Sequence, residues 1–521
     1  MEKKLLLSTK ITLKEIADFI FGKFHFSNIE LDPLLRAKII KSNQHLNQLL
    51  INKTPIYGVN TGLGESCFRL ISASQEYELQ RNLIAYLTCG TGDFLPLEVA
   101  RGTCIIRLIS LSKGLSGVSE ELLERMKLYV IRDWLPLIPR EGSLGASGDL
   151  IPLAYLAQII QGNGEVLANG KKRLISELLA EEKIAPYELK AKEGLALVNG
   201  TSVMTALAIV NLKHAQLLTK LAVICTSWLC MAIKGRVEAF GDLVNKDAKY
   251  FKGQHLVASQ ISELLREEDY STICYSQIKN IDGVTSDFVQ DPYSLRCTPQ
   301  ILGPVVETLD LIEEWLQNEM NSVADNPLIN ENGVIATGGN FYGGYIAHGM
   351  DYLKISLGHI ADLLDRQLTM LISDKTNRGL PANLANWPNL PKHEWHIHHG
   401  LKGLHQLVSA ITSEIMAKTI PNSVFSRSSE SHNQDKISLG MSASTQCYDI
   451  IESLFNIMGA YLICLAQALD LREQQLKSPL GKSIYALVRS NVKYVEKDQA
   501  LDLNLRDLVV SLKKLAKEDL I

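Results

Sequence analysis

Residues 141–154 read EGSLGASGDLIPLA, a loop with three glycines that runs directly into an apolar segment. For an isolated Ala-Ser-Gly tripeptide, the simplest interpretation is a tight turn, with Asp149 capping a helix that begins near Ile151. Glycine, however, also lets a backbone amide approach a carbonyl closely. If the Gly148 nitrogen attacks the Ala146 carbonyl and Ser147 loses water, a five-membered ring with a methylidene group results. The loop can therefore supply an electrophile that no ordinary side chain offers.

The C-terminal part of the chain shows the periodicity of long helices. One helix face is marked by apolar residues at alternating intervals of four and three, namely Ile346, Met350, Leu353, Leu357, Ile360 and Leu364. Similar runs occupy about 202–234, 303–323, 400–418 and 441–471. The first and last of these runs are apolar nearly all round, which predicts helices buried on every side, partly against another subunit. We expect a long-helix bundle over residues 201–521.

Residues 1–200 are interrupted by glycine and are expected to form a loop-rich N-terminal domain. Thr12 and Glu15 form a capping-box pattern that predicts a helix near 12–22. Asn169-Gly170 predicts a hairpin turn, one of few strand signals. The three prolines within 377–394 predict a long loop between helices. The expected fold class is therefore mainly α with a few short strands.

Composition excludes several classes of protein. The 521 residues include 53 Lys plus Arg and 57 Asp plus Glu, a net charge of −4 that argues against a nucleic-acid partner. Nine cysteines without a CxxC pair indicate reduced thiols in a cytoplasmic protein. The N-terminus lacks the apolar run of a signal peptide. The best membrane-span candidate, 202–234, is interrupted by charged and polar residues, so we expect no membrane association.

Three common motifs fail on inspection. Gly481-Lys482-Ser483 has Leu476 where a phosphate-binding loop needs glycine. Ser147 is not in a nucleophile elbow, because Asp149 stands where that motif needs glycine. The histidines at 396, 398 and 399 lack metal-site spacing and are interpreted as polar loop residues. We therefore expect no metal and no nucleotide cofactor.

Eight segments, in order along the chain, resemble the aromatic amino acid ammonia-lyase family, which includes histidine, phenylalanine and tyrosine lyases and the related aminomutases. They are YGVNTGLG, LQRNLIAYL, GASGDLIPLA, EGLALVNGT, QDPYSLRCTPQILGP, ADNPLI, GGNFYG and HNQDKISLG. The resemblance implies a fumarase/aspartase-like fold and a homotetramer whose sites draw on more than one subunit. It also implies that Ala146, Ser147 and Gly148 cyclise to 4-methylidene-imidazol-5-one. Within the family, GTGDFLP and HNQDKISLG look most like bacterial phenylalanine lyases.

The resemblance also assigns roles to individual residues. Tyr57 matches the catalytic base and needs a positive field, since a free tyrosine titrates near pH 10; alone, it could equally be a core aromatic. Arg296 matches the clamp for the substrate carboxylate, although a structural ion pair is the alternative. The other matched positions line the site or hold the prosthetic ring, and they are Asn199, Gln290, Tyr293, Phe341, Glu430 and Gln434.

The substrate is inferred from the pair Tyr86-Leu87, where the family's histidine lyases look like Ser-His, tyrosine lyases His-Leu and phenylalanine lyases Phe-Leu. Leu87 offers imidazole no hydrogen bond, and Gln434 stands where histidine lyases carry glutamate; both disfavour histidine. We expect L-phenylalanine to give trans-cinnamate and ammonia. Tyrosine as substrate, a 2,3-aminomutase, and a related protein without turnover remain alternatives. Leu63 and Ala324 depart from the family pattern near the site.

Overall fold

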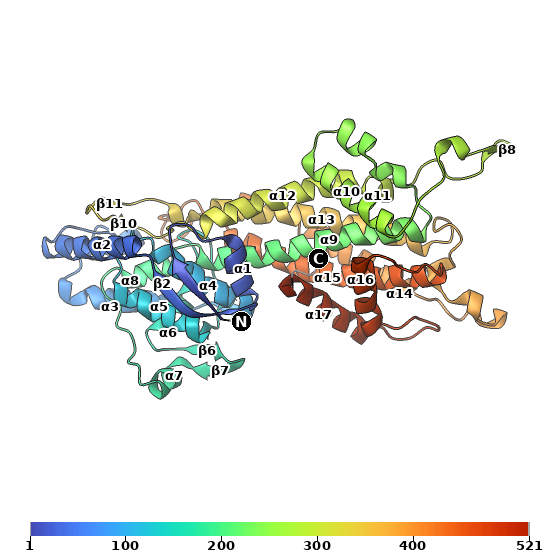
Figure 1. Cartoon of the computed structure of the whole chain (residues 1–521). Helices are drawn as coiled ribbons and strands as arrows, with labels where there is room; N and C mark the ends of the chain where they lie inside the picture. The colour runs from blue at the N-terminus through green and yellow to red at the C-terminus, as the bar shows by residue number, and fades with distance from the viewer. Residues whose placement is uncertain (1, 519–521) are drawn as a thin grey trace. The chain divides into compact units, whose positions relative to one another are not determined.

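Helices dominate residues 2–518, the part of the chain that this computed structural model describes (Figure 1). The four longest are α9 (Ser202–Ala232), α12 (Thr298–Glu319), α13 (Gly344–Ile372) and α15 (Gly440–Leu471). All six apolar residues of the predicted face within 346–364 are buried. The mainly α fold class is thus confirmed, and each long helix follows a periodic run of the sequence.

The chain forms two compact units whose segments alternate along the sequence. Unit 1 extends to Leu212 and includes Ile312–Asp351 and Pro421–Cys447; unit 2 comprises Lys213–Leu311, Tyr352–Ile420 and the chain from Tyr448 onward. Each of the four long helices contributes residues to both units. The domain boundary expected near residue 200 stays a prediction. The two units described here are defined by contacts between chain segments and not by one boundary along the chain.

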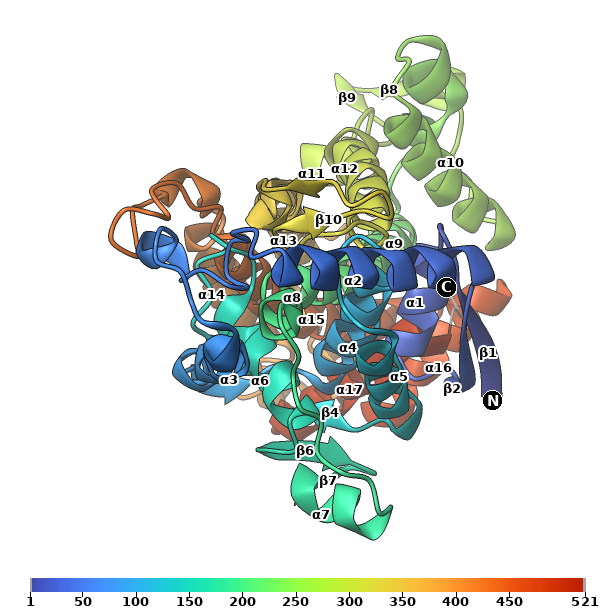
Figure 2. The ribbon, with the colours of Figure 1, turned by 90° about the vertical axis from the view of Figure 1, so that its left-hand side faces the viewer.

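Unit 1 contains most of the short elements (Figure 2). Three of its helices, α3, α6 and α8, pack on one another. The Tyr86-Leu87 pair lies in α3, α6 begins directly after the Ala-Ser-Gly loop, and α8 ends directly before Asn199. Its helices are α1 (Leu13–Ile20), α2 (Pro33–Ile51), α3 (Glu76–Leu87), α4 (Leu97–Leu111), α5 (Glu120–Arg132), α6 (Leu150–Ile160), α7 (Ile175–Glu181) and α8 (Glu193–Val198).

Five two- or three-stranded sheets accompany the helices among the described residues. The predicted Asn169-Gly170 hairpin is present: the two residues join β6 (Glu165–Ala168) to β7 (Lys171–Leu174), and both have the positive φ of a primed turn. The parallel pair β1 (Glu2–Leu7) and β2 (His25–Leu31) was not predicted. Between them, Thr12 caps α1 by accepting a hydrogen bond from the Glu15 amide, which is the hydroxyl half of the expected capping box. The other strands are β3 (Thr91–Phe94), β4 (Leu135–Pro136), β5 (Pro139–Glu141), β8 (Asn280–Ile281), β9 (Val284–Thr285), β10 (Leu328–Ile329) and β11 (Ile335–Ala336).

Unit 2 is built from helices and two long loops. Residues 377–394 form only short 3-10 turns, in agreement with the predicted loop. A second loop, between α10 and α11, carries the β8–β9 hairpin (Figure 1). The helices wholly within unit 2 are α10 (Lys252–Glu267), α11 (Tyr293–Arg296), α14 (Lys402–Ala417), α16 (Pro479–Asn491) and α17 (Asp502–Glu518).

Two helices, α9 and α15, are long and apolar enough to meet the length and composition criteria for a membrane span. Their most apolar windows are 89% and 83% buried inside the protein itself. Core helices of this kind satisfy the same criteria, because a helix surrounded by other helices is apolar on all sides. Their burial agrees with the expectation of core helices.

Candidate active site

The Ala-Ser-Gly loop packs closely against the backbone that follows α8. Gly148 has φ +77, and a Cβ at this position would lie 2.1 Å from the Gly200 carbonyl oxygen. The Asp149 amide donates to that same oxygen at 2.7 Å. Only glycine satisfies both the left-handed conformation and the close approach, which explains the residue type at position 148. Ala146 is also buried, so the tripeptide is held between packed segments.

Side chains from two distant segments hold Ser147. Asn199 Nδ2 donates to the Ser147 carbonyl oxygen at 2.8 Å, and Gln434 Nε2 donates to Ser147 Oγ at 3.1 Å. Ser438, which the sequence analysis did not single out, donates its hydroxyl to the Gly145 carbonyl oxygen at 2.9 Å. Its position within HNQDKISLG is the one sequence signal for this contact. The loop is therefore fixed on both sides of the tripeptide.

Asp149 directly precedes α6, as in the turn interpretation, but its side chain does not cap that helix. Its carboxylate makes no side-chain cap with α6 and instead accepts hydrogen bonds from the Val203 and Met204 amides, at 3.0 and 2.8 Å, in the first turn of α9. Complete burial raises the pKa of Asp149 to about 7, although these amides and the Ser143 hydroxyl favour the charged form. Tertiary packing brings the start of α9 within reach, so the side chain satisfies orphan amides of a helix it does not begin.

Two buried cations support the same region. The Arg107 guanidinium, fully buried, donates to the carbonyl oxygens of Ala196 and Asn199 at the end of α8. Burial lowers the pKa of Arg107 to about 10, opposed by nearby carboxylates. Lys192 Nζ contacts Asp325 Oδ2 at 2.5 Å, and both side chains are completely inaccessible to solvent. Neither cation was a predicted site residue.

We expect Lys192→Met to destabilise the protein by about 3–5 kcal/mol, because it leaves the Asp325 carboxylate buried without its partner. Lys190→Met is the matched control, since Lys190 pairs with Glu121 on the surface with a 52% exposed side chain. Urea unfolding followed by circular dichroism measures both variants. Equal unfolding midpoints for the two would contradict the importance assigned to the buried pair.

Tyr57 lies in a loop that is stabilised by hydrogen bonds to side chains of the loop itself. Asn60 Oδ1 accepts from the Ile56 amide at 2.7 Å, and Thr61 Oγ1 accepts from the Gly58 amide at 3.0 Å. The Tyr57 hydroxyl accepts a hydrogen bond from the Gly64 amide at 3.0 Å. Burial raises the pKa of Tyr57, the Gly64 hydrogen bond acts in the opposite direction, and the carboxylate of Glu430 raises it further. Among residues 2–518, the groups that shift the pKa of Tyr57 thus include no cation that would supply the positive field expected for its predicted role.

A cavity of about 380 Å³ in unit 1 brings most of the predicted site residues together. Leu87 is buried but is not among the residues that line it; α3 contributes Leu83 and Tyr86 instead. Burial raises the pKa of Tyr86 to about 12, and Glu430 and Tyr57 act in the same direction. The predicted residues that line the cavity are Tyr57, Tyr86, Ala146, Ser147, Asn199, Phe341, Glu430 and Gln434. Sequence analysis missed Asn326, Thr337, Tyr342, Asn433 and Asp435, and also Lys436.

Gln290, Tyr293 and Arg296 belong to unit 2 and do not line this cavity. Arg296 Nε donates to the Asp291 carbonyl oxygen at 2.9 Å, and its guanidinium lies 4.6 Å from the centre of the Tyr293 ring. Tyr293 is 71% exposed. This segment therefore presents an aromatic hydroxyl and a cation at the surface of its own unit.

The clustered histidines contact carboxylates. His398 Nε2 lies 3.6 Å from Glu394, and the His399 amide donates to Asp498 at 2.8 Å. Within residues 2–518, no group of three or more His, Cys, Asp or Glu side chains has the geometry to hold a metal ion. All nine cysteines are free thiols.

The sequence matches the family described as aromatic amino acid lyase over residues 11–490. A histidine ammonia-lyase of Bacillus anthracis is 34% identical over 482 residues, which are 92% of each chain. A tyrosine aminomutase from Streptomyces globisporus superposes with a TM-score of 0.90 at 30% identity, over 98% of this chain and 97% of that one. A phenylalanine aminomutase from Pantoea agglomerans gives a TM-score of 0.91 at 28% identity, over 99% and 100%. The names of these relatives include three different aromatic amino acids.

Proposed function

Because the chain belongs to the aromatic amino acid lyase family and is a carbon–nitrogen lyase, we propose that it converts L-phenylalanine to trans-cinnamate and ammonia. The apolar part of the cavity lining carries this proposal: Phe341 and four leucines, at positions 63, 83, 150 and 195, lie beside the polar residues of the same cavity. A phenyl ring needs no hydrogen-bond partner, whereas an imidazole packed against this apolar part would leave its nitrogens unpaired.

We propose that Ala146, Ser147 and Gly148 cyclise to 4-methylidene-imidazol-5-one. The left-handed conformation of Gly148, its close approach to Gly200 and the burial of Ala146 support this, since all three restrict the conformations open to the tripeptide. Asn199 and Gln434 are placed to hold the carbonyl and the reacting side chain of Ser147. Once formed, the group supplies an electrophilic carbon for the substrate amine.

In the proposed reaction, Tyr57 accepts the β-proton of the substrate at its hydroxyl oxygen. The Gly64 amide stabilises the phenolate form by donating to that oxygen. Glu430 lines the same cavity and is suited to hold the protonated amine, because a carboxylate attracts an ammonium. Phe341 is suited to pack against the substrate's aromatic ring.

We further propose a cytoplasmic homotetramer in which a neighbouring subunit contributes Gln290, Tyr293 and Arg296. These three residues do not line the cavity of their own chain, and the pKa of Tyr57 is raised in the single chain. An added cation from Arg296 would lower that pKa and pair with the substrate carboxylate. The free thiols are consistent with a reducing compartment.

Turnover of phenylalanine, tyrosine and histidine by the same preparation tests the substrate. We expect kcat/KM for phenylalanine to exceed that for histidine by about 100-fold or more, because the apolar wall penalises an unpaired imidazole. Tyr86→Phe should leave phenylalanine turnover within about threefold and lower tyrosine turnover about tenfold, since it removes a possible partner for the para-hydroxyl. Urocanate as the main product would overturn the proposal.

A second candidate is a 2,3-aminomutase, which the names of the two solved relatives favour. It shares the prosthetic group but returns ammonia to the β-carbon. Chromatography of the products separates the two reactions: the lyase yields the unsaturated acid, and the mutase yields mostly the β-amino acid. A predominance of β-amino acid at early times would replace the first proposal by the second.

A further inference from the structure

Asp291 sits inside the segment that carries Gln290, Tyr293 and Arg296, yet its own side chain faces the bundle. The carboxylate is 1% exposed, and both of its oxygens are engaged. Arg378 Nη2 contacts Oδ1 at 2.5 Å, and the Arg236 amide donates to Oδ2 at 2.7 Å. The Asp291 carbonyl oxygen also accepts from Arg296 Nε at 2.9 Å. One residue thus links the predicted carboxylate clamp to two basic residues elsewhere in unit 2.

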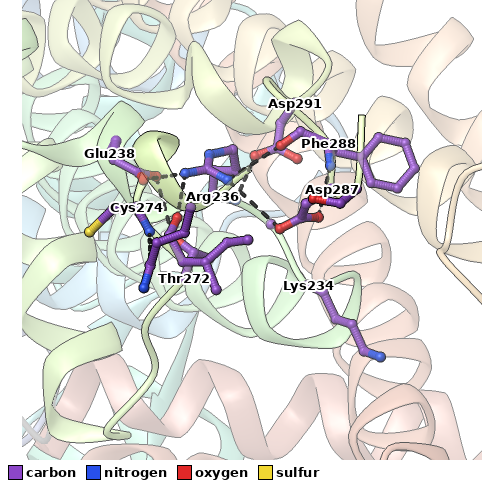
Figure 3. Close-up of polar contacts among 12 residues, drawn as sticks. Lys234, Arg236, Glu238, Thr272, Cys274, Asp287, Phe288 and Asp291 are labelled. Carbon is purple, nitrogen blue, oxygen red and sulfur yellow. Dashed lines mark hydrogen bonds and ion pairs between the residues drawn. The ribbon is translucent and has the colours of Figure 1, made fainter. Parts of the chain in front are cut away.

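Arg236 holds the loop that leads into this segment (Figure 3). Its guanidinium donates to the carbonyl oxygens of Ile273, at 2.8 Å, and Phe288, at 3.3 Å, and pairs with Glu238. It also lies 4.4 Å from the centre of the Tyr275 ring. The Arg236 side chain is only 4% exposed, although its partner Glu238 is 34% exposed. The two ends of the 273–288 loop are therefore fastened to one cation.

Arg378 fastens the same region from the loop that follows α13. Besides Asp291, it donates to the Lys234 carbonyl oxygen at 2.5 Å and lies 3.9 Å from the centre of the Phe288 ring. Its side chain is 9% exposed. Such a buried pair resists separation, because breaking it leaves a buried charge without solvent or an oppositely charged partner. The position of Asp291 is consequently fixed by contacts rather than by the exposed residues around it.

We propose that Arg378, acting through Asp291, is a positioning residue that sets where Arg296 and Tyr293 stand for substrate binding, with Arg236 holding the preceding loop. This inference rests on the proposed function of Arg296 as the carboxylate clamp. Tyr293 is 71% exposed, whereas Leu295 is fully buried and Gln367 Nε2 donates to the Ser294 carbonyl oxygen at 2.9 Å, so α11 is held at its centre. The two buried arginines fix the start of the segment at Asp291 and add the rigidity that a bidentate clamp requires.

The variant Arg378→Met tests the proposal, and Arg489→Met is its matched control. Arg489 also lies in unit 2, contacts a carboxylate, Asp470, at 2.5 Å, donates to the Val492 carbonyl oxygen at 3.2 Å and lies 5.5 Å from the centre of an aromatic ring, that of Tyr485. These contacts, with residues 470, 485 and 492, all lie outside the 290–296 segment. Loss of general stability should therefore affect both variants alike.

The readout separates binding of the carboxylate from binding of the ring. We expect Arg378→Met to raise KM for the amino acid and the inhibition constant of trans-cinnamate about tenfold or more. The inhibition constant of 2-phenylethylamine, which has no carboxylate, should change less than twofold. Arg378→Lys, which keeps a cation opposite Asp291, should restore cinnamate binding to within about threefold. Arg489→Met should leave all three constants unchanged.

Equal weakening of both inhibitors by Arg378→Met, or the same pattern in Arg489→Met, would overturn the inference and assign Arg378 a merely structural role. Should Arg378→Met fail to fold, Arg378→Lys and Asp291→Asn give the same comparison, and normal cinnamate binding in Asp291→Asn would overturn the inference. Absence of lyase turnover in the unaltered protein would contradict the proposed function instead. If that protein prefers tyrosine, p-coumarate and tyramine replace the two inhibitors.

Discussion

Ser147→Ala is expected to lower kcat by about 10⁴-fold or more, which corresponds to about 5.5 kcal/mol of transition-state stabilisation. Alanine at this position has no hydroxyl to lose, so the methylidene carbon cannot form. Intact mass provides a second measurement. The mass of the unaltered protein should be lower than the mass calculated from its sequence by two waters, about 36 Da, by the stoichiometry of ring closure and elimination. The variant cannot lose the water that comes from the Ser147 hydroxyl, so its mass should not show that part of the decrease.

Ser143→Ala is the control for this variant. Ser143 lies in the same loop and donates to Asp149 Oδ1 at 3.1 Å, so its removal perturbs the loop without touching the reacting hydroxyl. We expect Ser143→Ala to keep the two-water mass loss and to retain activity within about tenfold. Activity of Ser147→Ala within tenfold of the unaltered protein would show that the electrophile lies elsewhere.

Tyr57→Phe is expected to lower kcat by about 10³-fold while leaving the two-water mass loss intact, because it removes the base and not the prosthetic group. Tyr155→Phe is a close match. The Tyr155 hydroxyl accepts from the Gly90 amide at 3.1 Å, as the Tyr57 hydroxyl accepts from the Gly64 amide at 3.0 Å, but Tyr155 does not line the cavity. We expect Tyr155→Phe to retain activity within about threefold.

The pH dependence follows from the same assignment. Burial raises the pKa of Tyr57, so the phenolate is the minor form at neutral pH. A base must be deprotonated, and kcat/KM should therefore rise with pH up to the pKa of the assembled site and fall tenfold per pH unit below it. Tyr57→Phe should lack this limb. An unchanged limb in the variant would show that another group is the base.

Local sequence patterns predicted the helices well because helical periodicity depends on residues three and four apart. The 346–364 face is buried as expected, and the Asn169-Gly170 turn forms its hairpin. The strand pair β1–β2 escaped notice, since the two strands pair in parallel and the partner of each lies across a helix. The partners of the Asp149 carboxylate escaped notice for a similar reason: the amides at 203 and 204 are more than fifty residues away.

Some residues of the candidate site could likewise be predicted from local sequence patterns, and others could not. Motif matches predicted eight residues that line one cavity, and the cyclisation proposed for Ala-Ser-Gly was inferred from residue types alone. Leu87 shows the limit of that approach, because adjacent residues on a helix point in different directions and only packing decides which faces the cavity. Ser438 and Lys436 lie within the matched segment HNQDKISLG, but only tertiary packing shows that Ser438 contacts the loop and that Lys436 lines the cavity.

By itself, the sequence determined the helical architecture, the reaction family and the tripeptide that can become the electrophile. Tertiary structure alone decided how that chemistry is supported: Arg107 beneath the turn at Asn199, the Lys192–Asp325 pair and the Arg378–Asp291 pair. Lys192 and Asp325 are 133 residues apart, and Arg378 and Asp291 are 87 apart. The cost of burying each charge is offset only when its partner arrives by folding, so no local pattern announces the pairing.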